Sequence, residues 1–295
     1  MRSIILATVL AAPCLLGLAA GAKAGCGPRS FGVERRLVLS TKGGFAVGFK
    51  SYPRSLDLAD HEVVLTFDDG PSPKTTPEVL AALAQECVKA TFFLIGRHAA
   101  AYPALVRREL AEGHSVGHHS FSHPIMRLLP DAAARADIEK GFMADDQAAY
   151  GAASARPKVP FFRFPGFADT PALLAWLESR DIGIFGADLW ASDWLEMTPD
   201  AERKLVMARL EAAGRGILLL HDTKPSTAAM LPALLRDLKA RGFKIVQIVP
   251  GDAKPVFRKA PPGWRSETEA ILAKVLRGRG KVVSPGAAHL PESVE

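Results

Sequence analysis

The chain has 295 residues, of which 48% are hydrophobic and 23% are charged, and this composition excludes a chain that is disordered throughout. It predicts one folded domain with additional segments at its ends. The formal net charge of +6 comes mainly from those ends, since residues 1–24 carry Arg2 and Lys23 and residues 251–295 carry 8 basic and 5 acidic residues. A nearly neutral folded part argues against a nucleic-acid partner, whereas an acidic envelope polymer near the basic tail stays compatible with the charge.

Residues 1–24 have the three parts of a signal peptide: a basic residue (Arg2), an apolar run over residues 4–20, and small residues around the cleavage point at 22–24. The alternative is a membrane anchor, but the run is short, contains a proline and a glycine, and is followed by no stop-transfer pattern. We therefore expect an exported protein, periplasmic or secreted, without stable membrane insertion after cleavage.

Residues 25–60 contain a glycine-rich patch and short alternating segments, and are interpreted as an N-terminal extension packed on the main domain, without catalytic residues. After loss of the signal peptide, Cys26 and Cys87 remain, and they could pair in an oxidising compartment. Their spacing in the sequence does not decide whether they do.

Residues 61–250 alternate short apolar runs with helical patterns, which predicts repeated βα units. The runs are nearly continuous in apolar residues, as is typical of parallel strands covered on both faces. We expect strands at 62–67, 89–95, 114–118, 159–164, 182–187, 216–221 and 243–249, with helices that include 131–149, 200–213 and 227–240. The fold class is therefore α/β, with a barrel or barrel-like arrangement.

Residues 251–295 are rich in proline, glycine and basic residues, and are expected to form a flexible tail with one short helix from Ser266 to Leu276.

Polar residues follow the predicted strands of the barrel at their carboxyl ends. In a parallel barrel these ends form one rim, where active sites are built. The residues concerned are Asp68, Asp69, His119, His123, Arg163, Asp188, Asp193 and His221.

Two carboxylates, Asp68 and Asp69, emerge together from the first strand and precede a Gly-Pro turn. Alone, such a pair is more simply explained as the cap of the following helix. Adjacent anions are unfavourable unless a cation compensates them. The histidines described next supply part of such a cation site.

His119 and His123 are four residues apart, a spacing that on one helical turn directs both rings to the same side. With one carboxylate they form a His₂Asp set that leaves coordination positions open, as catalytic metal sites do. Zinc fits these ligands best, and cobalt, nickel or another first-row ion would also bind. His114 and His118 have the same spacing but lie on a predicted strand, where four residues span roughly 13 Å and cannot chelate.

A hydrolytic metal site needs a base for the water and an acid for the leaving group, and Asp68 and His221 are the candidates. Arg163 could pair with Asp68, and Asp193 could accept a hydrogen bond from His221. Considered individually, Arg163 and Asp193 are more often surface ion-pair residues, and their place on the rim favours a role in the site.

Five segments, TFDDGP at 66–71, HSFSHP at 119–124, RFPG at 163–166, SDW at 192–194 and LLLHD at 218–222, resemble in order the motifs of the polysaccharide deacetylases with the NodB homology domain, carbohydrate esterase family 4. The resemblance covers about 190 residues and implies a distorted (β/α)₇ barrel that hydrolyses acetyl groups on sugars.

The resemblance also implies roles for individual residues. Asp68 is the expected base, with Arg163 orienting it, and His221 is the expected acid, oriented by Asp193. The expected ligands of one divalent metal are Asp69, His119 and His123. The expected substrate contacts are Trp194 and Leu219, which line a pocket for the acetyl methyl, and the backbone N–H of Gly166, which stabilises the oxyanion.

The chain departs from the family pattern at two places. Gly166 stands where a large residue such as tyrosine is usual, and Trp190 lies where the fourth motif usually has an aspartate. We expect these changes to alter substrate selectivity or rate.

The leading hypothesis is an N-deacetylase acting on an acetylated glycan such as peptidoglycan or chitooligosaccharide. An O-acetyl esterase on acetylated xylan or an exopolysaccharide would use the same machinery, and a non-catalytic carbohydrate-binding barrel is the alternative from another class. A metalloprotease of the HExxH type is disfavoured because that motif is missing. The sequence predicts no oligomeric state.

Overall fold

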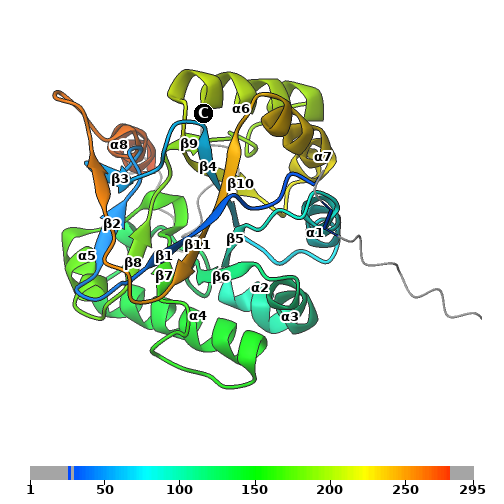
Figure 1. Cartoon of the computed structure of the whole chain (residues 1–295). Coiled ribbons are helices and arrows are strands. Elements are labelled where there is room, and N and C mark those ends of the chain that lie inside the picture. Colours follow the sequence, from blue (N-terminus) through cyan, green and yellow to red (C-terminus); the bar gives the residue numbers. More distant parts are fainter. Residues whose placement is uncertain (1–25, 28–29, 280–295) are drawn as a thin grey trace, which may run out of the picture.

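The protein is described by a computed structural model covering residues 26–27 and 30–279. The predicted signal peptide (1–24) and the end of the predicted tail (280–295) lie outside the described residues. Figure 1 shows the strands in the middle of the molecule with helices around them.

Each of the seven strands expected between residues 61 and 250 is present. They are β4 (Glu62–Asp68), β5 (Thr91–Leu94), β6 (Ser115–His118), β7 (Phe161–Phe162), β8 (Gly183–Phe185), β10 (Gly216–His221) and β11 (Lys244–Pro250). All the pairings between them are parallel. The short strand β9 (Leu189–Trp190) was not predicted.

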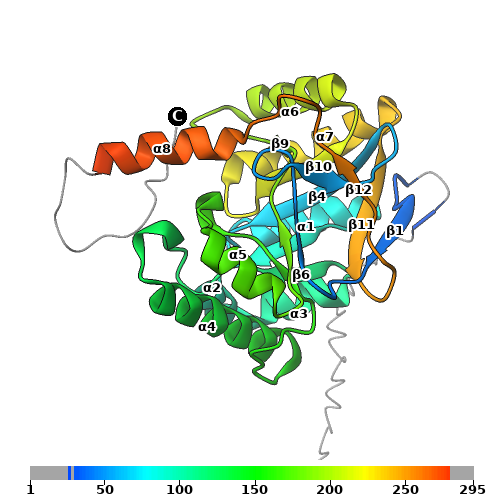
Figure 2. The same ribbon diagram turned by 90° about the vertical axis from the view of Figure 1, so that its left-hand side faces the viewer.

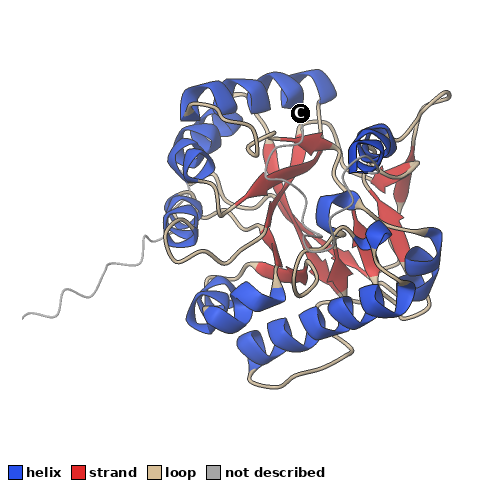
Figure 3. Ribbon diagram, turned by 180° about the vertical axis from the view of Figure 1, so that it is seen from behind, coloured by secondary structure: helices blue, strands red, loops and turns tan. Residues whose placement is uncertain are grey.

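The strands close into a barrel. The order β4–β5–β6–β7–β8 runs along one side, and β10 pairs with the other side of β4. The chain leaves β8, bends over residues 186–188 and enters β9, which pairs with β10. One bent segment thus joins both ends of the series, and helices cover the outside of the ring (Figure 3). The predicted distorted α/β barrel is confirmed.

The helices are α1 (Thr76–Gln85), α2 (Gly96–Ala101), α3 (Pro103–Ala111), α4 (Asp131–Tyr150), α5 (Pro171–Glu178), α6 (Pro199–Ala213), α7 (Pro225–Ala240) and α8 (Glu267–Arg279). The three helices predicted by range correspond to α4, α6 and α7. Helices α3, α5, α6 and α7 begin with proline, whose fixed φ and missing N–H suit the first helical position.

The alternation along β4 decides which of its side chains enter the barrel. Val63, Leu65 and Phe67 belong to the apolar cluster shared with α1, α6 and α7, whereas Val64 packs in the cluster of the barrel interior. Because successive side chains of a strand point to opposite faces, Asp68 lies on the inner face with Val64.

The N-terminal extension contributes strands that were not predicted individually. It supplies β1 (Arg35–Leu39), parallel to β11, and β2 (Phe45–Val47), parallel to β8. A further strand, β3 (Arg54–Leu56), pairs antiparallel with β12 (Phe257–Lys259). These strands have three to five residues, and so short a run carries a weak periodic signal.

The helix predicted in the tail is present as α8, which begins one residue later than expected. The strand β12 in the same segment was not predicted. Cys26 and Cys87 form a disulfide that ties the N-terminal segment to the residues after α1. Within residues 30–279, every helix is too short or too polar to span a membrane.

Candidate active site

A cavity of about 440 Å³ opens among the residues that follow the strands. Of the residues predicted for the site, it is lined by Asp68, Asp69, His119, His123, Gly166, Trp194, Leu219 and His221. Arg163 and Asp193 lie buried behind it, at 0% and 3% exposure, and each contacts one of these lining residues.

Asp68 ends β4 and is held by Arg163 inside the barrel. The Arg163 Nη1 donates to Asp68 Oδ1 at 2.7 Å and to Thr66 Oγ1, and the other guanidinium nitrogens donate to two carbonyl oxygens at the end of β8, those of residues 185 and 186. Burial raises the pKa of Asp68 to about 6, against the opposing effect of the Arg163 charge. With every branch of Arg163 engaged, the Asp68 carboxylate has a defined orientation.

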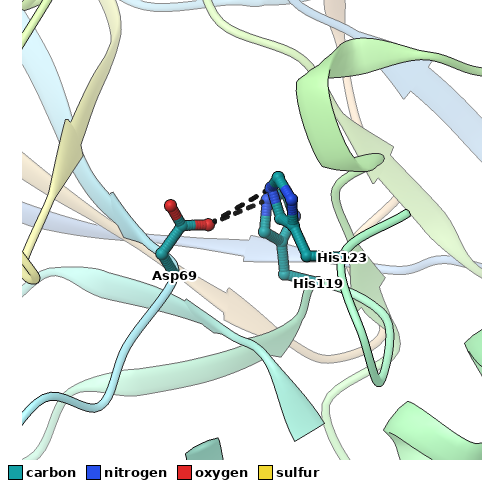
Figure 4. A group of neighbouring side chains, drawn as sticks. All are labelled: Asp69, His119 and His123. Carbon is teal, nitrogen blue, oxygen red and sulfur yellow. Dashed lines mark ion pairs between the residues drawn. The ribbon is translucent and has the colours of Figure 1, made fainter. Parts of the chain in front are cut away.

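Asp69 follows β4 with a left-handed backbone, φ of 72°, and lines the same cavity as Asp68. Its Oδ1 lies 3.5 Å from His119 Nε2 and 3.4 Å from His123 Nε2 (Figure 4). The His98 ring donates from Nδ1 to the Asp69 carbonyl at 2.7 Å and so helps to hold this turn.

His119 and His123 do not lie on a helical turn, as their spacing had suggested. They lie on a loop after β6 in which Ser120 and His123 are left-handed, with φ of 63° and 59°. The loop turns back on itself and brings the two ring centroids to 5.0 Å. The predicted proximity therefore holds, but the left-handed loop produces it.

The donor set fits a divalent metal. Burial and the neighbouring His123 lower the pKa of His119 to about 3, so its ring is neutral, as metal ligation requires. Its Nδ1–H donates to the Arg163 carbonyl at 2.8 Å, which leaves the Nε2 lone pair for the metal. Asp69 Oδ1 is buried without a hydrogen-bond partner among residues 30–279, and one ligand atom of each of the three residues lies within 4.8 Å of the others.

His221 ends β10 and is oriented by Asp193. Its Nδ1–H donates to Asp193 Oδ1 at 2.8 Å, and its backbone N–H donates to Asp193 Oδ2 at 2.7 Å. Burial alone would lower the pKa of His221, but the Asp193 and Asp69 carboxylates outweigh it and raise the pKa to about 10. The Nε2 faces the cavity, 3.9 Å from Asp69 Oδ2.

Three of the polar residues considered from the sequence have structural roles. Asp188 accepts hydrogen bonds from Phe49 N, Ser55 Oγ and Ile217 N, and so fixes the bend between β8 and β9 instead of lining the cavity. His114 accepts from Ala90 N, and His118 is buried against Asp145.

The sequence reasoning missed several residues that line the cavity: Ile95, Arg97, His98, Phe164, Phe167, Thr223, Lys224, Thr268, Ile271 and Leu272. Arg97 and His98 follow β5, so the rule of strand ends applied to the second strand would have found them. Thr268, Ile271 and Leu272 belong to α8, far outside the repeated βα pattern, and had no such signal.

Gly70 closes the turn that presents both carboxylates, and we expect Gly70→Ala to damage the site. A Cβ at this position would lie 2.3 Å from Asp222 Oδ2, and Asp222 is buried and accepts a hydrogen bond from Thr76. Relief of this clash must move the turn, at a cost of about 1–3 kcal/mol in the free energy of unfolding. Urea unfolding and activity would both be measured.

The double variant Gly70→Ala/Asp222→Ala separates the clash from other causes. If the clash is responsible, the alanine at 70 destabilises the Asp222→Ala protein much less than it destabilises the wild type. Equal effects in both backgrounds would rule out this steric explanation.

The fold and site are those of an α/β-barrel hydrolase, and comparison with known proteins places the chain among them. The polysaccharide deacetylase family matches residues 56–181. A chitooligosaccharide deacetylase of Sinorhizobium fredii is 34% identical over 209 residues, which cover 66% of this chain and 94% of that protein. The chain belongs to the polysaccharide deacetylase family.

Two further relatives are similar over smaller shares of their length. The peptidoglycan-N-acetylglucosamine deacetylase PgdA of Listeria monocytogenes is 36% identical over 187 residues, 63% of this chain and 38% of that protein. The structure of a peptidoglycan deacetylase of Bdellovibrio bacteriovorus superposes with a TM-score of 0.67 at 30% identity, covering 76% of this chain and 61% of that one. The chain thus spans less than two thirds of both relatives.

Proposed function

We propose that this protein removes acetyl groups from the N-acetylated sugars of a glycan of the peptidoglycan or chitooligosaccharide type, with the help of one divalent metal ion. One observation carries the proposal: the Asp69, His119 and His123 group shares a single cavity with an oriented carboxylate and an oriented imidazole. The relatives named above act on these two kinds of glycan.

Asp69, His119 and His123 would hold the metal, and zinc suits one carboxylate and two imidazoles best, with cobalt or nickel as alternatives. When bound, such an ion polarises a carbonyl oxygen and lowers the pKa of water. The chain itself supplies the neutral imidazole of His119 and, on Asp69, a carboxylate oxygen without a hydrogen-bond partner among the described residues.

Asp68 is the proposed base. Its carboxylate faces the cavity next to Asp69, and Arg163 fixes its orientation, so it can take a proton from the attacking water. His221 is the proposed acid. Asp193 holds its ring and favours the protonated form, so Nε2–H can protonate the leaving nitrogen.

Three residues are proposed to receive the acetyl group. Trp194 and Leu219 line the cavity as apolar surfaces suited to the methyl, and Gly166 lines the same cavity, with its backbone N–H as the proposed donor to the oxyanion. Gly166 is left-handed, with φ of 55°, which glycine adopts without strain.

We further propose that the protein acts outside the cytoplasm, in the periplasm or as a secreted enzyme. The signal-peptide pattern of residues 1–24 and the Cys26–Cys87 disulfide support this, because disulfides persist in oxidising compartments.

Acetate release tests the proposal. Zinc-loaded protein would be incubated with chitopentaose, peptidoglycan fragments and acetylxylan, with and without a chelator. We expect chelator-sensitive acetate from at least one N-acetylated glycan. Acetate from acetylxylan alone would establish the O-acetyl esterase instead, and none from any substrate would leave a non-catalytic barrel.

A further inference from the structure

Helix α8 lies at the periphery of the barrel (Figure 2) and is anchored firmly at its N-terminal end. Thr268 donates from its backbone N–H to the Lys50 carbonyl at 3.1 Å, and the Lys50 Nζ pairs with Glu267 at 2.5 Å. Just before the helix, the Trp264 indole N–H donates to the Phe49 carbonyl at 2.7 Å. The start of α8 is thereby fastened to the segment that follows β2.

A second group of contacts holds the adjacent turn of α8. The Arg127 guanidinium pairs with both carboxylate oxygens of Glu269 and also with Asp169. Leu272 is 2% exposed and packs with Ile125 and Ala168. The ion pairs with Lys50 and Arg127 and the apolar contacts of Leu272 together fix the position of α8 on the barrel.

This position makes α8 a wall of the cavity, through Thr268, Ile271 and Leu272. The cavity is also lined by a series of neighbouring aromatic rings, which extends from Phe167 through Trp190 and Trp194 to His221, the proposed acid. The centroid distances are 6.1 Å from His221 to Trp194, 5.9 Å from Trp194 to Trp190 and 6.2 Å from Trp190 to Phe167, with the last pair stacked at 25°. Lys50, which pairs with α8, also places its Nζ 4.9 Å from the Trp190 ring.

The cavity therefore has two chemically different parts. Carboxylates and imidazoles surround Asp69, whereas Phe167, Trp190, Ile271 and Leu272 offer aromatic and aliphatic surface. A pyranose ring has C–H faces that pack on such surface and hydroxyls at its edge that stay hydrated. Apolar walls with a few placed polar groups are the usual form of a ligand site.

We propose that α8, together with Trp190 and Phe167, binds the sugar next to the one that is deacetylated, and so makes the enzyme selective for glycans of two or more sugars. The inference rests on the proposed function, since the reacting acetamide must lie at the Asp69 end. The neighbouring sugar then packs on Trp190 and Phe167 and contacts α8.

The test compares Ile271→Asp with Ala270→Asp. Both place a carboxylate on α8, but Ile271 lines the cavity and Ala270 is exposed beside it. With N-acetylated chitooligosaccharides of two to five sugars, we expect Ile271→Asp to raise KM about tenfold for the longer substrates and to leave kcat nearly unchanged. Ala270→Asp should match the wild type with every substrate, including p-nitrophenyl acetate, which reaches only the metal end.

Two further measurements keep the outcome decisive. Isothermal titration of the metal-free protein with N-acetylated chitotetraose, which carries no charge, reports binding without turnover, and the affinity should weaken about tenfold in Ile271→Asp and in Trp190→Ala. A chain ended after Pro262 removes α8 altogether, and circular dichroism would show that each variant is folded. If Ile271→Ala and Ile271→Asp bind and turn over long and short substrates like the wild type, the inference is wrong.

A truncated chain that is faster on every substrate would also overturn the inference, because α8 would then cover the site instead of extending it. Failure of the proposed function has a different signature: the wild type would release no acetate from any substrate, while the titration would still report whether α8 contributes to glycan binding.

Discussion

Asp68→Asn is expected to lower kcat by about 10²–10⁴-fold while the protein still binds its metal. The asparagine has the shape of the aspartate and can still accept from Arg163, but it cannot take a proton from water. Asp68 is 2% exposed and contacts Arg163 at 2.7 Å, so the guanidinium loses its counter-charge. We expect the free energy of unfolding to fall by about 3 kcal/mol as a result.

Acetate release, metal content and urea unfolding would be measured on the same preparation of Asp68→Asn. The three readouts separate a lost base from a lost metal or a lost fold. Turnover within tenfold of the wild type, at equal metal content, would remove Asp68 from the role of base.

His123→Ala is expected to abolish stoichiometric metal binding, with loss of affinity of at least about 100-fold and loss of turnover to match. One of three protein ligands disappears, and the remaining pair, Asp69 and His119, cannot hold a first-row ion as tightly. The fold should survive, because His123 lies on a loop and is 21% exposed. Metal content after dialysis, by elemental analysis, is the direct measurement.

The matched control is His61→Ala, the same substitution at a histidine that pairs with Asp60 far from the cavity-lining residues. It should retain a full equivalent of metal. If His123→Ala retains one equivalent as well, the metal is held elsewhere, and the assignment of the three ligands is wrong.

The strands of the barrel could be predicted because each is nearly continuous in apolar residues. The segment 62–67, for example, is buried on both faces, with Val63 toward the helices and Val64 toward the interior. Such a run differs from its neighbours without any knowledge of its partners. The rule that parallel strands end on one rim then brought Asp69, His119 and His123 into one predicted site.

The elements that were not predicted are short or polar, unlike the apolar strands of the barrel. Strand β2 has three residues, and its place beside β8 depends on a partner more than 130 residues away. Residues 257–279 are rich in charge and proline, so their composition resembles a tail, and although the helix within them was predicted, its packing on the barrel was not. They are held by ion pairs with Lys50 and Arg127, and the sequence around these two residues does not indicate such contacts.

By itself, the sequence determined the family, the barrel and the types of residue that meet on its rim, because apolar runs and short motifs are local properties of the chain. Only the tertiary structure decided how those residues meet. The left-handed backbone of Asp69 and of the 119–123 loop aims three ligand atoms at one point, and Asp188 holds a bend of the barrel although it follows a strand like the others. Only the structure shows that part of the expected tail lines the cavity. Contacts between distant segments depend on packing and produce no periodic pattern in the sequence.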